Sequence, residues 1–177
     1  MKLEPTPIEG AFVLEPEPHA DARGSFARVF CKDELAARGL EMDIAQASLS
    51  HNPIEGTLRG MHLQVAPHEE IKIVGCIAGA LYDVLLDLRE GSPSFGRWWA
   101  VDLAPPLSRL VYIPRGVAHG FMTRAPDTTV SYWISAPYAP AAARGVRFDD
   151  PRFGIVWPGP PAMIGERDRS FPDYGPW

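Results

Sequence analysis

Short apolar stretches separated by turn residues run through most of the chain. Stretches of five to eight residues that are rich in Val, Ile, Leu, Tyr and Trp and bounded by Gly, Pro, Asn or Asp are typical of strands. Their spacing favours an all-β sandwich or barrel. The predicted strands are Thr57–Gln64, Ile71–Ile77, Leu81–Leu88, Trp98–Leu103, Arg109–Ile113 and Thr129–Ser135.

One segment has the pattern of a helix. Asp33–Gly39 opens with acidic residues and ends on a glycine that can close the last turn. The helix is predicted to be short and peripheral. The 19 prolines and 16 glycines, spread along the chain, favour short strands and turns over long helices.

The strand Ile71–Ile77 is apolar on both alternating faces, which predicts that both are covered. Lys72 shares a face with Val74 and Cys76, so its ammonium is predicted to point into an enclosed space that must supply a partner or a ligand. Alternatively, Lys72 lies at the strand start and reaches solvent through its long stem.

Composition limits the classes of protein. A chain of 177 residues with 46% hydrophobic and 22% charged residues fits one globular domain spanning 1–177. A net charge of -5 argues against a nucleic-acid partner, and no apolar run approaches the roughly 20 residues of a membrane span. Residues 1–18 lack the apolar core of a secretory signal, so we expect a cytoplasmic protein with Cys31 and Cys76 reduced.

Three polar side chains occur on apolar β segments, namely those of His62, His119 and Tyr132. Each by itself is explained by a hydrogen bond inside a core. Together they suggest a site, because Tyr132 shares its strand face with Val130 and Ile134 and therefore points inward.

The segment Pro114-Arg-Gly-Val-Ala-His119 is similar to the second metal-binding motif of cupins. The first cupin motif has two histidines two positions apart, where this chain has His62 and Gln64. Glutamine is a poor ligand for a transition metal, so we expect no metal and no cofactor. A metal-dependent cupin such as a dioxygenase, using His62, His119 and Glu69 or Glu70, stays an alternative.

Without a metal, the candidates are an imidazole base, an enclosed cation and a phenolic acid, a set that suits proton abstraction beside a carbonyl. Histidine, with a reference pKa of about 6.5, is available as a base near neutrality. Lysine or histidine can stabilise the enolate, and a tyrosine can return the proton to the opposite face.

Two arginines are candidates for binding a diphosphate, because guanidinium groups match phosphate oxygens. These are Arg23 and Arg59. On a regular strand Arg59 faces away from His62, so both line one site only if a bulge intervenes or the arginine curls around.

Several motifs, read in order, resemble the dTDP-4-dehydrorhamnose 3,5-epimerase family over roughly residues 5–170. The resemblance implies a cupin-like jelly roll or β-sandwich with a few short peripheral helices, and no metal. It also implies a homodimer that exchanges N-terminal strands within about 1–50; residues 146–177 are predicted to wrap the core. The motifs are Asp21-Ala-Arg-Gly-Ser-Phe26, Gly56-Thr-Leu-Arg-Gly-Met-His-Leu-Gln64, Asp83–Gly96, Ile113–Phe121, Asp149-Asp-Pro151 and Ile155-Val-Trp-Pro158.

The resemblance also implies roles for single residues. His62 matches the general base, Asp168 the carboxylate that orients it, and Tyr132 the acid. Lys72 and His119 match residues that contact the sugar and its enolate. The remaining predicted binding residues for the nucleotide-diphosphate sugar are Arg23 and Phe26, which reach the partner's site, together with Gln46, Arg59, Tyr138 and Arg167.

Four positions depart from the family pattern. Arg28 and Ala143 replace glutamates, Ser48 replaces an asparagine and Trp133 replaces a lysine. The first three serve the nucleotide, so the preferred base or sugar is expected to differ.

The sequence thus predicts an isomerase that inverts C3, or C3 and C5, of a nucleotide-linked 4-keto-6-deoxy sugar in deoxysugar biosynthesis of the dTDP-L-rhamnose type. A non-catalytic sugar-nucleotide binding module is a further alternative.

Overall fold

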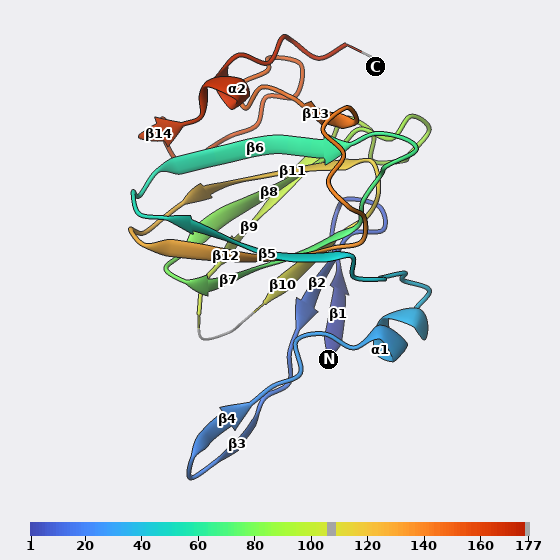
Figure 1. The fold of residues 1–177 in the computed structure, drawn as a ribbon, viewed down its shortest axis with the longest axis vertical. Helices are drawn as coiled ribbons and strands as arrows, with labels where there is room; N and C mark the ends of the chain where they lie inside the picture. The colour runs from blue at the N-terminus through green and yellow to red at the C-terminus, as the bar shows by residue number, and fades with distance from the viewer. Residues whose placement is uncertain (106–108, 176–177) are drawn as a thin grey trace.

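The structure is a computed structural model that describes residues 1–105 and 109–175. Two β-sheets face each other (Figure 1), one in the strand order β1-β2-β10-β7-β12-β5 and the other in the order β13-β6-β11-β8-β9, with β14 added beside β6. Neighbouring strands within each of these two orders are antiparallel, and β14 runs parallel to β6. The predicted all-β, cupin-like sandwich is confirmed.

The predicted strands match observed ones to within one residue at either end. The elements are β1 (Lys2–Pro5), β2 (Phe12–Glu15), β3 (His19–Asp21), β4 (Gly24–Phe26), α1 (Lys32–Ala36), β5 (Gln46–Asn52), β6 (Thr57–Gln64), β7 (Lys72–Ala78), β8 (Leu81–Asp87), β9 (Trp98–Leu103), β10 (Leu110–Ile113), β11 (Val117–Thr123), β12 (Thr128–Ile134), β13 (Ala143–Gly145), β14 (Met163–Ile164) and α2 (Glu166–Arg169).

The main core lies between the two sheets. Val74 of β7 and Val130 of β12 pack in one cluster with Leu85 of β8 and Phe121 of β11, each no more than 1% exposed. Residues that alternate inward along each strand bury their apolar side chains together, which holds the sheets face to face. The inward-facing polar residues of the same strands are thereby held at one end of this core.

The outer faces of the sheets are covered unequally. Ile73 on the outer face of β7 packs with Leu35 of α1 and with Met42, as expected for a strand covered on both sides. Ile77 at the other end of β7 is 54% exposed within the single chain. The prediction that another layer or a second subunit covers this face stays a prediction there. The segment with α1 and Met42 that covers Ile73 does not extend to Ile77. Apolar surface therefore remains exposed on the outer face of this sheet.

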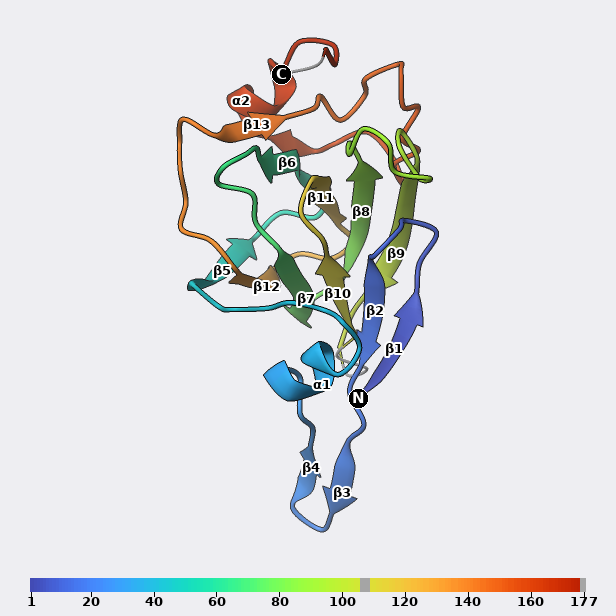
Figure 2. The same cartoon turned by 90° about the vertical axis from the view of Figure 1, so that its right-hand side faces the viewer.

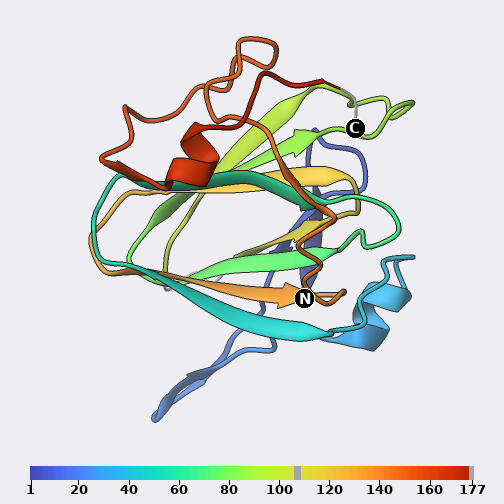
Figure 3. The same ribbon diagram turned by 45° about the horizontal axis from the view of Figure 1, so that its top comes forward.

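The C-terminal segment from 146 wraps the outer face of the second sheet; of the range 146–177, residues 176 and 177 lie outside the described residues. Val146 and Phe153 pack there in one cluster with Leu86 of β8. The segment then adds β14 beside β6 and brings α2 against it (Figure 3). It therefore contains more regular structure than the irregular wrap that the sequence predicts.

The N-terminal region carries two smaller features. The predicted helix is α1, and Gly39 follows it with a φ of +73°. Strands β3 and β4 form a hairpin that projects away from the sandwich (Figure 2), and its strand residues are exposed. In the part of the chain that the structure describes, no helix has the length and apolar character needed to cross a membrane.

Candidate active site

A β-bulge in β6 brings two predicted site residues to the same side of the sheet. His62 pairs with His119 of β11, and Arg59 pairs with Phe121, so three residues of β6 span the length of two on β11. Gly60 lies at this bulge with a φ of +128°, and a Cβ there would come within 2.4 Å of the Gly120 Cα. Arg59 and His62 consequently line one cavity.

The cavity that Arg59 and His62 line has a volume of about 310 Å³ and lies between the sheets. It is called the larger cavity, because a second one beside it is smaller. Its lining includes residues of both, namely Arg59, His62 and His119 from the second sheet and Lys72 and Tyr132 from the first. The imidazole and the phenol therefore lie in one compartment, as the predicted chemistry requires. The volume falls within the range of about 300–1,000 Å³ that is usual for small-molecule sites.

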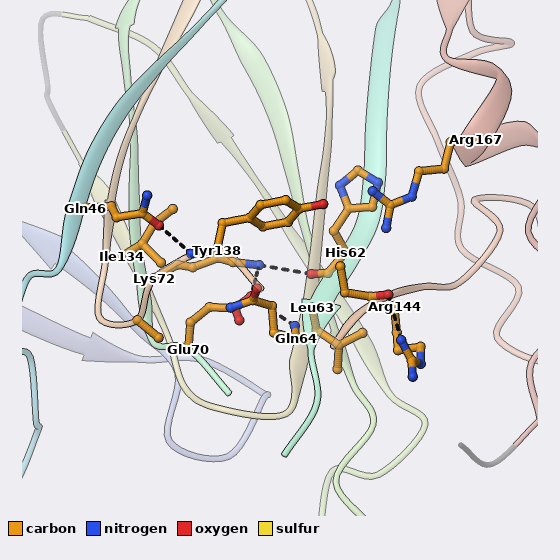
Figure 4. A pocket seen from close by; sticks show the side chains of 12 residues that line it. Gln46, His62, Leu63, Gln64, Glu70, Lys72, Ile134, Tyr138, Arg144 and Arg167 are labelled. Carbon is orange, nitrogen blue, oxygen red and sulfur yellow. Dashed lines mark hydrogen bonds and ion pairs between the residues drawn. The ribbon is translucent and has the colours of Figure 1, made fainter. Parts of the chain in front are cut away.

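A second cavity of about 170 Å³ lies beside it and is shown in Figure 4. Gln46, Tyr138 and Arg167 line this smaller cavity. His62 and Lys72 line both cavities, so the two are parts of one continuous site. Such a site has room for a ligand with two distinct halves.

His62 and Asp168 form a close pair although they are 106 positions apart in the sequence. His62 Nε2 lies 2.6 Å from Asp168 Oδ1, and Asp168 Oδ2 accepts a hydrogen bond from the Gly60 N–H at 3.0 Å. Asp168 belongs to α2, which the C-terminal wrap places against β6. The Phe171 ring meets the imidazole edge-on at 6.2 Å and further restricts its orientation.

The charge on Asp168 determines which nitrogen of His62 holds the proton. Burial by itself raises the pKa of Asp168, but the hydrogen bonds from His62 and Gly60 outweigh it and keep that pKa below its usual value. The carboxylate is therefore ionised at neutral pH and can only accept hydrogen bonds. Nε2 of His62 must then donate, which leaves Nδ1 as the free base.

Tyr132 points inward from β12 and packs against the main core. Its ring meets that of His119 edge-on, with centroids 5.9 Å apart. Burial raises the pKa of Tyr132 well above its usual value, and the negative charge of Asp83 raises it further, while Arg59 opposes the shift. The phenol is consequently protonated at neutral pH and available as an acid.

Lys72 is enclosed, with a side chain only 12% exposed. Its Nζ lies 2.9 Å from Glu70 Oε1 and donates to the backbone oxygen of His62 at 3.1 Å (Figure 4). The interpretation that Lys72 reaches solvent through its stem is therefore wrong. An ammonium has three donors, so one remains for a ligand in either cavity.

Two further carboxylates pair with site residues, and of these Asp83 was not predicted, while Glu70 was named only for the metal-dependent alternative. Asp83 Oδ1 lies 2.7 Å from His119 Nε2, with both side chains buried, and Glu70 pairs with Lys72. Asp83 lies on the apolar strand β8 with Leu81 and Leu85. An acidic residue in such a strand, on its inward face, was the signal that could have identified it.

Two predicted binding residues lie outside both cavities. Arg23 and Phe26 belong to the β3–β4 hairpin, and the Phe26 side chain is 77% exposed. Arg23 forms an ion pair only with its neighbour Asp21 among the described residues. Within a single chain, the hairpin does not contribute to the lining of either cavity.

Three of the four side chains named for a metal site are engaged with other protein groups. His62 pairs with Asp168, His119 with Asp83, and Glu70 with Lys72. Across residues 1–105 and 109–175, no three His, Cys, Asp or Glu side chains are grouped so that they could hold a metal ion. This arrangement gives no support to the metal-dependent alternative.

In this cupin-like sandwich an oriented histidine shares a cavity with an inward phenol, which is the arrangement of an epimerase that moves protons beside a carbonyl. A family model described as dTDP-4-dehydrorhamnose 3,5-epimerase matches residues 5–175. The chain belongs to this family.

Relatives within the family include enzymes that invert one centre and enzymes that invert two. A dTDP-4-dehydrorhamnose 3-epimerase from Streptomyces niveus is 38% identical, with 96% of this chain and 82% of that protein covered. The crystal structure of the 3,5-epimerase from Elizabethkingia anophelis has a TM-score of 0.94 at 33% identity, covering 98% of this chain and 96% of that one. That of the Bacillus anthracis 3,5-epimerase, with TDP and pyrophosphate bound, has a TM-score of 0.92 at 34% identity, covering 97% and 98%.

Proposed function

We propose that this protein inverts C3, or C3 and C5, of a nucleotide-diphosphate 4-keto-6-deoxy sugar by moving protons. The observation that carries the proposal is that His62, held by Asp168, shares one cavity with the phenol of Tyr132. Inversion needs a base on one face of the sugar ring and an acid on the other. The two sheets of the sandwich supply one each.

The reaction follows from these groups. Nδ1 of His62 removes the proton from the carbon beside the ketone, and the electrons of that C–H bond move onto the ketone oxygen to give an enolate. The free donor of Lys72 stabilises the enolate oxygen. As the carbonyl re-forms, the phenol of Tyr132 protonates the same carbon from the opposite face. Proton exchange with water then returns His62 to its neutral form and Tyr132 to its protonated form.

The smaller cavity is the proposed site of the nucleotide. Tyr138 offers an aromatic face for the base there, and Arg167 of the smaller cavity and Arg59 of the larger one offer guanidinium groups for the diphosphate. The TDP bound to the Bacillus anthracis relative supports a nucleotide as part of the ligand. Ala143 lines the smaller cavity and Ser48 the larger one, and both replace larger polar residues of the family pattern, so they act on which base or sugar is preferred.

Incubation in deuterated water tests the proposal. The 4-keto sugar nucleotide is expected to gain deuterium at C3, and also at C5 if both centres react, as measured by NMR and mass spectrometry. Parallel reactions with thymidine, cytidine and guanosine diphosphate sugars identify the preferred base. Tight binding without exchange at either carbon would contradict the proposal and favour the non-catalytic binding module.

A homodimer that exchanges its N-terminal hairpin is part of the proposed function. The hairpin projects from its own sandwich and carries Arg23 and exposed Phe26 away from both cavities (Figure 2). The outer face of the first sheet has a depression lined by Leu49, Ile77 and Trp133 among others, and Leu49 is 69% exposed. Apolar surface of this kind is typical of a protein interface. Trp133, at a position where the family pattern has lysine, enlarges this apolar surface.

Subunit mixing tests the exchanged dimer. Phe26→Ala and His62→Asn homodimers are each expected to be impaired, the first through a higher KM and the second through the loss of its base. In mixed dimers, one site receives Phe26 and His62 in their native forms, so activity is expected to rise above the sum of the two homodimers. Arg124→Ala, at an exposed arginine on a different part of the surface, is the control for the first variant. Monomers by sedimentation, or no rise on mixing, would contradict the exchange.

A further inference from the structure

Gln64, at the end of β6, uses its whole side-chain amide to join separate segments. Its Oε1 accepts a hydrogen bond from the Ala139 N–H at 2.6 Å, and its Nε2 donates to the backbone oxygens of His68 at 3.0 Å and Pro137 at 3.2 Å. The residue is 6% exposed and lines the smaller cavity. Few polar groups at this depth remain without a partner, and here every partner is backbone.

The contacts of Gln64 lie on both sides of Tyr138. Pro137 and Ala139 flank it, and the Tyr138 N–H itself donates to Gln46 Oε1 at 2.9 Å (Figure 4). Tyr138 is 59% exposed and lies in neither a helix nor a strand. Among the described residues its backbone belongs to no sheet ladder, and two glutamine side chains bind this segment instead.

We propose that Gln64 is a positioning residue for substrate binding, which holds the Tyr138 backbone so that the aromatic ring stands ready for the nucleotide base. The inference rests on the proposed function, in which Tyr138 receives that base. Gln64 acts through Tyr138 and touches none of the reacting atoms. Preorganised binding groups lower the entropy cost of association, so losing them weakens binding more than chemistry.

The side-chain amide of Gln64 suits this positioning role because it donates and accepts hydrogen bonds at the same time. A carboxylate at position 64 accepts from Ala139 but cannot donate to the oxygens of His68 and Pro137, and a thioether serves none of the three. The backbone N–H of Gln64 also donates to Glu70 Oε1 at 3.1 Å. This bond holds the strand end in place when the side chain is changed.

The variants Gln64→Met and Gln64→Glu test the proposal. KM for the sugar nucleotide is expected to rise about tenfold, the effect of losing roughly 1.4 kcal/mol of hydrogen bonding, while kcat stays within about twofold. The rate of deuterium uptake at saturating substrate is expected to follow kcat. An unchanged KM, or a fall in kcat with KM unaltered, would overturn the assignment.

A double-mutant cycle separates positioning from a general loss of stability. In a Tyr138→Ala background, Gln64→Met is expected to raise KM no further, because the residue through which it acts is gone. Additive effects would refute the proposal. Thr123→Val is the matched control, since Thr123 is 1% exposed and joins Thr57 N–H and Ile54 O at a distance from Tyr138. Wild-type protein without deuterium exchange would instead count against the proposed function itself.

Discussion

Replacing His62 by asparagine is expected to lower kcat by about a thousandfold and to abolish deuterium uptake at C3. Positioned acid–base groups contribute about 10²–10⁴ in rate, and His62 is the base of the proposed reaction. Asparagine is close in size to the inner part of the imidazole but accepts no proton near neutrality. Rates are measured by single-turnover NMR in deuterated water.

The partner of His62 permits a finer test of the same base. Asp168→Asn keeps the shape of the side chain but removes its charge and lets it donate, so Nε2 of His62 is no longer required to hold the proton. A fall of roughly a hundredfold in kcat is expected, with KM little changed. Asp149→Asn, in the exposed ion pair with Arg147, is the matched control. Full activity of Asp168→Asn would show that the carboxylate does not set the protonation of His62.

Replacing Tyr132 by phenylalanine is expected to separate the two proton transfers. The base is intact, so the substrate still loses its C3 proton and takes deuterium back on the original face. Epimer formation falls by about a hundredfold, because no acid stands on the opposite face. The measurement compares deuterium in recovered substrate with the amount of epimer in the same sample.

The phenol of Tyr112 provides the control for this substitution. It is buried outside both cavities and donates to the backbone oxygen of Glu41 at 3.0 Å. Tyr112→Phe therefore removes a comparable hydroxyl and is expected to leave the ratio of exchange to epimer unchanged. If Tyr132→Phe loses exchange and epimer formation equally, Tyr132 is not the acid of the second step.

Local pattern was sufficient for the strands that alternate regularly. Leu81–Asp87 and Thr128–Ile134 were predicted to within one residue because their apolar side chains face a core. Gln46–Asn52 was missed. It is an edge strand whose residues are mostly exposed, so its sequence carries no apolar alternation, and pairing with β12 makes it a strand.

The site residues also divide into those that the sequence identified and those whose placement needed the structure. Strand pattern supplied His62, Tyr132 and Lys72 as candidates, and motif resemblance added Asp168 and the roles of all four. Reasoning on the residues alone left open whether Arg59 faces His62 and whether Lys72 is enclosed. The bulge at Gly60 decided the first question, and the ion pair with Glu70 decided the second.

The sequence by itself determined an all-β chain with its histidines and inward tyrosine on particular strands, because strand formation and side-chain direction follow from a two-residue period. Only the tertiary structure showed the contact of Asp168 with His62, which the family resemblance had implied, and the pairing of Asp83 with His119, which the sequence had not indicated. Those contacts join residues 106 and 36 positions apart. These two contacts depend on the strand register and on the path of the C-terminal segment. Neither can be predicted from the local periodicity of the sequence.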